Sequence, residues 1–169
     1  MPTFSLDDAE YRQRVHTNGR AADQNFGADE SLFRRFPKES LVNGWPMPLT
    51  VHFDDTGISV NRSRYSLPQD VLEPDCCDGY VRVGQVVLEF LASDIPAQLP
   101  AEIPAYRFVL RHVPLECCYA HSVIWVNEEG DIERPCLKPS KTVRNLFRAE
   151  LLTKMQAAGR VPREFLPRE

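Results

Sequence analysis

Residues Thr142–Ala158, TVRNLFRAELLTKMQAA, decide the fold class because they form the one stretch with the residue spacing of a long helix. Apolar side chains recur there at intervals of three and four residues, which places them on one helix face. Ser140 suits the N-cap position, and Gly159 suits the position just after the helix ends. The pattern predicts an amphipathic C-terminal helix that packs on the rest of the protein.

The sequence before this helix reads as a succession of short strands without intervening helices. The turn sequence Asp54–Gly57 separates two of them, Leu49–Phe53 and Ile58–Arg62, and predicts a β-hairpin. Glu30–Phe36 fits either a strand or a short helix. This order predicts an α+β fold, with a mainly antiparallel sheet of about five or six strands and one long C-terminal helix. The remaining predicted strands are Tyr80–Leu91, Tyr106–Val113 and Ser122–Val126.

The length of 169 residues fits a single domain. The first 28 residues are polar and rich in turn-forming residues, so we expect a loosely packed N-terminal arm over 1–28. Residues 29–169 should then form a single α+β domain. Fourteen prolines, which mainly separate the short strands, favour such a sheet.

The net charge of −4 is unevenly distributed along the chain. The segment Lys138–Arg163 holds seven basic residues and one acid, which gives +6 and leaves −10 for the rest. A general nucleic-acid coat is excluded by the acidic total, but a local basic edge is not. The helix could present that edge to an anionic partner, or it could dock against the acidic remainder of the chain.

No secretory signal and no membrane-spanning apolar run is visible, so we expect a cytoplasmic protein that does not contact a membrane. The five cysteines fall as two adjacent pairs and one single residue. Because this odd set does not resemble a disulfide framework, we expect thiols. No cofactor and no metal is expected.

Arginines and small polar residues concentrate in Ser59–Ser66, SVNRSRYS. Guanidinium groups bind phosphate and carboxylate oxygens in a bidentate manner, so this segment is a candidate anion site. On a strand, Ser59 and Asn61 would share one face while Val60 and Arg62 share the other. The alternative is a solvated hairpin strand with arginines paired to surface acids. The full set of candidate ligand-binding residues is Arg34, Arg35, Ser59, Asn61, Arg62, Arg64, Tyr65, Arg144 and Arg148.

A second candidate segment holds two histidines, His112 and His121, with Glu116 between them. Histidine exchanges protons near neutral pH, so the pair could cleave a phosphodiester without a metal, with Glu116 orienting one ring. These three are the candidate catalytic residues. The alternative is that each histidine is a hydrogen-bonded structural residue.

The same segment leaves two other chemistries open. Cys118-x-x-His121, with Cys117 and His112 nearby, has ligand-like spacing for zinc, and Cys76-Cys77 could supply a second pair of ligands. Adjacent cysteines seldom bind one ion together, which favours thiols instead. A nucleophilic Cys117 or Cys118 beside His121 or His112 is also possible, although Glu116 would oppose thiolate formation.

Phosphate-binding loops, dinucleotide fingerprints and common hydrolase motifs are absent from the sequence. The succession Leu32–Pro37, Ser59–Ser66, His112-x-Pro114 and Tyr119-x-His121-Ser122 resembles small bacterial proteins of uncharacterised activity that are encoded near mobile elements or defence genes. This resemblance implies an accessory role in antiviral defence or in a mobile-element system.

We therefore expect a bacterial accessory or binding protein. Its arginine clusters would engage a nucleic acid, a nucleotide or an acidic protein partner. The alternative is a small metal-independent RNA or nucleotide hydrolase that uses His112 and His121. The oligomeric state stays open.

Overall fold

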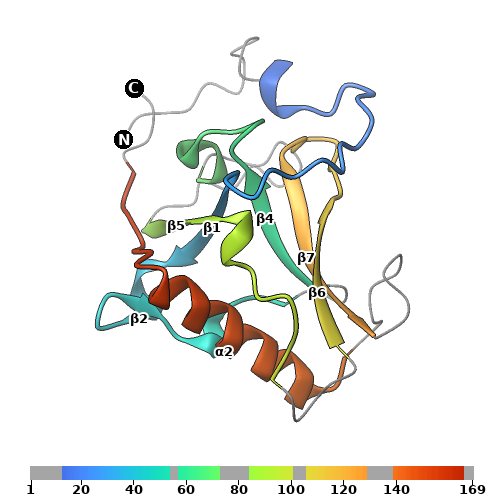
Figure 1. The fold of residues 1–169 in the computed structure, drawn as a ribbon. Coiled ribbons are helices and arrows are strands. Elements are labelled where there is room, and N and C mark those ends of the chain that lie inside the picture. The colour runs from blue at the N-terminus through green and yellow to red at the C-terminus, as the bar shows by residue number, and fades with distance from the viewer. Residues whose placement is uncertain (1–12, 54–56, 73–83, 101–105, 129–138, 166–169) are drawn as a thin grey trace.

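The computed structural model describes residues 13–53, 57–72, 84–100, 106–128 and 139–165. Five strands form one antiparallel sheet in the order β5-β1-β4-β7-β6, and one long helix, α2, follows the last strand (Figure 1). The predicted α+β class is confirmed. The strands of the large sheet are β1 (Ser31–Pro37), β4 (Gly57–Arg62), β5 (Gln85–Leu91), β6 (Tyr106–His112) and β7 (His121–Glu128), and α2 spans Lys141–Ala157.

The described part of the chain also holds a short helical stretch at residues 13–15, a second, two-stranded sheet and four short 3-10 helices. The small sheet pairs β2 (Leu41–Val42) with β3 (Trp45–Pro46). The 3-10 helices are η1 (Lys38–Ser40), η2 (Pro48–Thr50), η3 (Pro68–Val71) and η4 (Ala92–Asp94).

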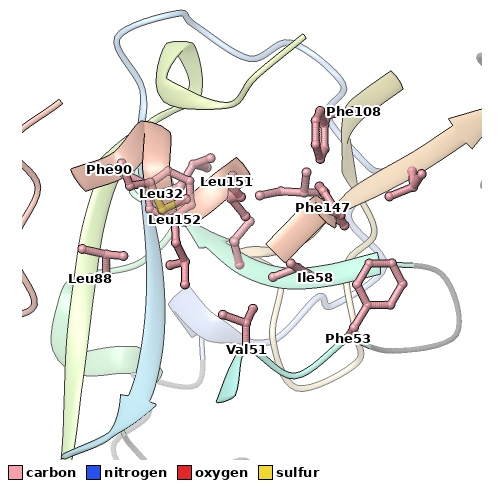
Figure 2. Close-up of a cluster of buried hydrophobic side chains, with 14 of the residues drawn as sticks. Leu32, Val51, Phe53, Ile58, Leu88, Phe90, Phe108, Phe147, Leu151 and Leu152 are labelled. Atoms are coloured by element: carbon pink, nitrogen blue, oxygen red, sulfur yellow. The ribbon is translucent and has the colours of Figure 1, made fainter. Parts of the chain in front are cut away.

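The main core lies between α2 and one face of the sheet. Phe147 of α2 is fully buried and contacts the rings of Phe53 and Phe108, with ring centroids 5.3 and 4.3 Å away (Figure 2). The predicted cap of this helix is confirmed, because Ser140 Oγ accepts a hydrogen bond from the Val143 amide at 3.2 Å. Gly159 follows the helix with a φ of +71°, a conformation that glycine adopts without strain.

The predicted hairpin over 49–62 is wrong. Leu49–Phe53 holds part of η2 and no strand, and β4 pairs with β1 and β7 instead. Val51 and Phe53 are buried in the core without being in a strand, which explains their strand-like apolar pattern. Glu30–Phe36, for which strand and helix were both open, forms β1. The strand expected to begin at Tyr80 is described from Gln85 onward, and 80–83 lies outside the described residues.

Both edges of the sheet are covered in part by other segments. Arg163, beyond α2, exchanges two backbone hydrogen bonds with Val87 of β5, at 2.7 and 2.8 Å. At the other edge, Gln98 bridges to Arg107 of β6, and the Gln24 side chain bonds the backbone of His112. This covering limits edge-to-edge pairing with other chains.

Candidate functional site

A pocket of about 200 Å³ lies against the sheet face that points away from α2. Phe33, Asn61 and His121 are register partners across β1, β4 and β7, and all three line it. Because directly paired residues point to the same side of a sheet, these three side chains form one row. The remaining lining residues are Val15, Arg34, Arg35, Ser59, Val60, Tyr65, Ser66, Asp70, Val71, Leu115, Cys117, Cys118 and Ala120.

The pocket thus brings together the two segments that the sequence marked as polar and reactive. Strand alternation explains how β4 contributes. Ile58 and Val60 are buried in the core beside α2, so Ser59 and Asn61 point to the opposite face. The predicted division of β4 into two faces is confirmed.

The second wall is the tight turn between β6 and β7. Leu115 and Cys118 exchange backbone hydrogen bonds at 3.0 and 3.1 Å, and the His121 amide donates to the Cys118 carbonyl at 3.2 Å. Two backbone hydrogen bonds connect this turn to residues near the N-terminus. The Tyr119 amide donates to the Val15 carbonyl at 2.6 Å, and the Thr17 amide donates to the Glu116 carbonyl at 2.9 Å. These contacts hold Cys118 beside the sheet, close to His121 at the start of β7.

Cys118 carries a thiol that lies within reach of the amide of Asn61. The Asn61 Nδ2 group donates to Cys118 Sγ at 3.5 Å. His121 Nδ1 lies 2.6 Å from the Val113 carbonyl oxygen, which can only accept, so Nδ1 carries a proton there. In the neutral ring, Nε2 is then the basic nitrogen. An amide donor, a thiol and an imidazole therefore line one pocket.

The adjacent Cys117 is disulfide-bonded, so the prediction that all the cysteines are thiols is wrong for this residue. Cys76, Cys77 and Cys136 lie outside the described residues. Among the residues that the structure describes, no group of three histidine, cysteine or acidic side chains could hold a metal ion.

Arg34, Arg35 and Asp70 supply the charges of the pocket lining. The Arg35 guanidinium donates to the Val71 carbonyl at 2.9 Å, which fixes its position. The Asp70 carboxylate instead accepts from Arg14 at 2.8 Å and from the Leu67 amide at 2.6 Å. The lining therefore holds two guanidinium groups and one carboxylate, and that carboxylate pairs with Arg14.

Arg62, a predicted ligand-binding residue, lies elsewhere and is fully buried. Its guanidinium donates to both carboxylate oxygens of Glu30, at 2.7 and 2.8 Å, and to the carbonyls of Asp23 and Asn25 at 2.5 and 2.6 Å. The ring of Phe26 covers it at 3.9 Å. Arg62 therefore ties 23–30, part of which was expected to be an arm, to the end of β4.

Arg64 and Tyr65 both bind the Asp23 carboxylate, with donor–acceptor distances of 2.8 and 2.6 Å. The Tyr65 hydroxyl, the Asn25 amide and then Arg64 hold the pKa of Asp23 well below its usual range, against a smaller opposing effect of burial. Burial, followed by the hydrogen bond to Asp23, raises the pKa of the Tyr65 hydroxyl. These two residues thus extend the network of Arg62, although Tyr65 also contributes to the pocket wall.

His112 and His121 lie on opposite faces of the sheet. His112 pairs with Ser122, and Ser122 pairs with the core residue Val60, so His112 points to the α2 side. Its Nδ1 accepts from the Asp23 amide at 2.8 Å and its Nε2 donates to the Tyr119 carbonyl at 2.5 Å. Burial is the main reason that the pKa of His112 is lowered. The structure does not bring the two imidazoles together.

Of the other predicted site residues, Arg34 lines the pocket, whereas Glu116, Arg144 and Arg148 do not. The Arg34 guanidinium donates to the backbone carbonyls of Ser59 and His52 at 2.6 and 3.4 Å. Glu116 is solvent-exposed and does not line the pocket. Arg144 and Arg148 lie on α2, where burial and then the charge of Arg144 lower the pKa of Arg148.

Sequence reasoning missed Phe33, Asp70 and Val71 as parts of the pocket. Phe33 reads as a core residue, and the other two fall in a short 3-10 turn without a motif. Only the tertiary packing of η3 against β1 reveals their role.

Comparisons of the chain with known protein families, with curated proteins and with solved structures give no match. Within the described ranges, no helix is both long enough and apolar enough to cross a membrane. The pocket geometry is therefore the basis for any functional conclusion.

Proposed function

We propose that this chain is a binding protein whose pocket takes a small anionic ligand, such as a phosphate or carboxylate group. The observation that carries the proposal is the position of Arg35 in a pocket that also holds Ser59, Asn61 and His121. A cation with hydroxyl, amide and imidazole groups around it is a common way to bind such oxygens.

The charge of Arg35 supports this ligand class over a cationic one. Its guanidinium lies in the pocket lining, and the carboxylate of Asp70 in the same lining pairs with Arg14. A positively charged ligand would have to displace Arg14 and also approach Arg35, and both steps are unfavourable.

The size of the pocket favours a small ligand over a polymer. Pockets for drug-sized molecules enclose about 300–1,000 Å³, and this one encloses about 200 Å³. A phosphate, a short carboxylate or the phosphate end of a nucleotide matches that volume. The arginines expected to contact nucleic acid do not form one surface, because Arg62 is buried and Arg144 and Arg148 lie on α2.

The setting of this activity is also a proposal. From the sequence we infer a bacterial accessory role, in antiviral defence or in a mobile-element system, with a protein partner, in the cytoplasm. The cation pair Arg144 and Arg148 supports an acidic partner, because the described residues include no acid that pairs with either. The Cys117 disulfide weighs against the cytoplasm, since disulfides persist mainly in oxidising compartments.

Thermal unfolding with inorganic phosphate tests the ligand class. Phosphate at about ten times its dissociation constant should stabilise the folded state by about 1.4 kcal/mol, which raises Tm by about 3–6 °C. Arg35→Gln should remove this shift. Arg107→Gln is the matched control, because it removes one positive charge at an exposed position of β6.

The control also corrects for the general stabilisation of proteins by phosphate salts. If Arg35→Gln and Arg107→Gln keep the same phosphate-dependent shift as the unmodified protein, the pocket does not bind the anion and the proposal fails.

A further inference from the structure

We propose that Cys118 is a covalent modification site within this pocket, and that it reacts with small anions that carry an electrophilic carbon. This inference rests on the proposed function for the choice of an anionic reagent. The reactivity of the thiol itself rests on separate contacts, so the two claims can fail independently.

The pocket surrounds Cys118 with the groups that thiol chemistry requires. The nucleophilic form of cysteine is the thiolate, which is favoured by nearby hydrogen-bond donors and cations. Asn61 Nδ2 donates to Sγ at 3.5 Å, within the range of a hydrogen bond to sulfur. Arg35 lines the same cavity and carries a positive charge.

His121 supplies a proton acceptor from the same lining. Its Nδ1 proton is engaged by the Val113 carbonyl at 2.6 Å, so the neutral ring is basic at Nε2. A thiol, an imidazole and an amide in one pocket are the groups from which an activated cysteine is built. Glu116 was expected to oppose thiolate formation, but its side chain is solvent-exposed and outside the pocket lining.

The covalent step is a substitution at carbon. The Cys118 S–H proton passes to His121 Nε2, the sulfur forms a bond to the electrophilic carbon, and the leaving group departs with its bonding electron pair. With iodoacetate as the probe, the product is a carboxymethyl thioether and the leaving group is iodide. The carboxylate of the probe would lie near Arg35.

Backbone hydrogen bonds within the turn between β6 and β7 hold Cys118 in this position. Its amide and carbonyl both bond Leu115, and its carbonyl also accepts from the His121 amide. The side chain is half-buried and lines the pocket. Reaction at Cys118 should therefore depend on what fits the pocket.

The test compares iodoacetate with the neutral reagent iodoacetamide on the full chain, without a reductant, by peptide mass mapping of Cys118. The measured quantity is the rate with iodoacetate divided by the rate with iodoacetamide. This ratio should be about five times larger in the folded protein than in the unfolded protein, which is the effect of one partly exposed charge. Asn61→Ala should slow both reagents, while Arg35→Gln should slow iodoacetate alone. Cys118→Ser identifies the modified residue.

The wild-type measurement keeps the inference falsifiable if a variant does not fold. The inference is overturned if Cys118 in the folded protein reacts with both reagents no faster than Cys118 in the unfolded chain does. Fast reaction with no preference for iodoacetate, and no protection by inorganic phosphate, supports the reactive thiol and contradicts the anion pocket. Phosphate binding without fast alkylation supports the pocket and overturns the modification site.

Discussion

At the scale of single residues, the strongest feature is the burial of Arg62 within a complete set of partners. Its guanidinium meets one carboxylate and two carbonyls, and an aromatic ring covers it. Removal of one partner of a buried ion pair leaves an uncompensated charge, which costs more than the pair itself contributes. Arg62 therefore has a structural role that its place in an arginine-rich segment does not reveal.

Replacement of Arg62 by glutamine should lower the free energy of unfolding by about 3–5 kcal/mol, because Glu30 would remain buried without its cation. Arg64→Gln should have a much smaller effect, since Arg64 is an exposed partner of Asp23. Urea denaturation of both variants measures the difference. Equal losses for the two would show that the Arg62 network does not stabilise the fold.

His112 should make stability depend on pH near neutrality. Its pKa is lowered in the folded protein, so the unfolded chain binds more protons as the pH falls through the ordinary histidine pKa of about 6.5. The free energy of unfolding should therefore decrease between pH 7 and pH 5. Asp23 should also reduce stability as the pH falls, but only below about pH 4, because its pKa is lowered from the ordinary value of a carboxyl group.

His112→Gln should remove most of the slope between pH 7 and pH 5, because glutamine can accept from Asp23 and donate to Tyr119 without titrating. Denaturation at several pH values gives the slope. An unchanged slope in this variant would assign the pH dependence to other groups.

For single residues, the sequence predicts which polar side-chain groups are present but not which residues they contact. The residue types of Ser59–Ser66 correctly indicate polar contacts, yet Ser59 and Asn61 line the pocket while Arg62 and Arg64 bind Asp23. That division depends on residue 23, which is about forty positions away, and no local pattern encodes such a contact.

At the scale of secondary-structure elements, local patterns predict α2 and most strands well. Helix spacing, the Ser140 cap and Gly159 are all short-range signals, and the structure confirms them. Strand pairing is long-range, and it is where the predicted hairpin fails. Gly57 illustrates the reason: a Cβ at this position would lie 2.2 Å from the Ile124 carbonyl oxygen, so this glycine permits the close approach of β7 rather than a turn.

The packing of α2 on the sheet predicts a large loss on truncation of Phe147. This side chain is fully buried between Phe53 and Phe108, so Phe147→Ala should lower the free energy of unfolding by about 3–5 kcal/mol. Lys154→Ala, on the exposed side of the same helix, should change it by less than about 0.5 kcal/mol. Chemical denaturation measures both, and a small loss for Phe147→Ala would contradict the central role of this contact.

At the scale of the whole molecule, the sheet separates the main core from the pocket. One face packs against α2 and supplies most of the core, while the other carries the pocket under the turn between β6 and β7. The basic residues of α2 and the cation of the pocket consequently lie on different sides. The uneven charge of the sequence is therefore the sum of separate local features, and their separation in space could not be predicted without the fold.

The most direct test of the anion pocket is a titration with inorganic phosphate followed by two-dimensional ¹H–¹⁵N NMR. We predict that the largest shifts occur at the side-chain amide of Asn61 and at the backbone amides of Cys118, Ala120 and His121, which line the pocket. Arg35→Gln should abolish those shifts. Shifts confined to the α2 residues around Arg144 and Arg148, or unchanged shifts in Arg35→Gln, would contradict the assignment of the anion site to this pocket.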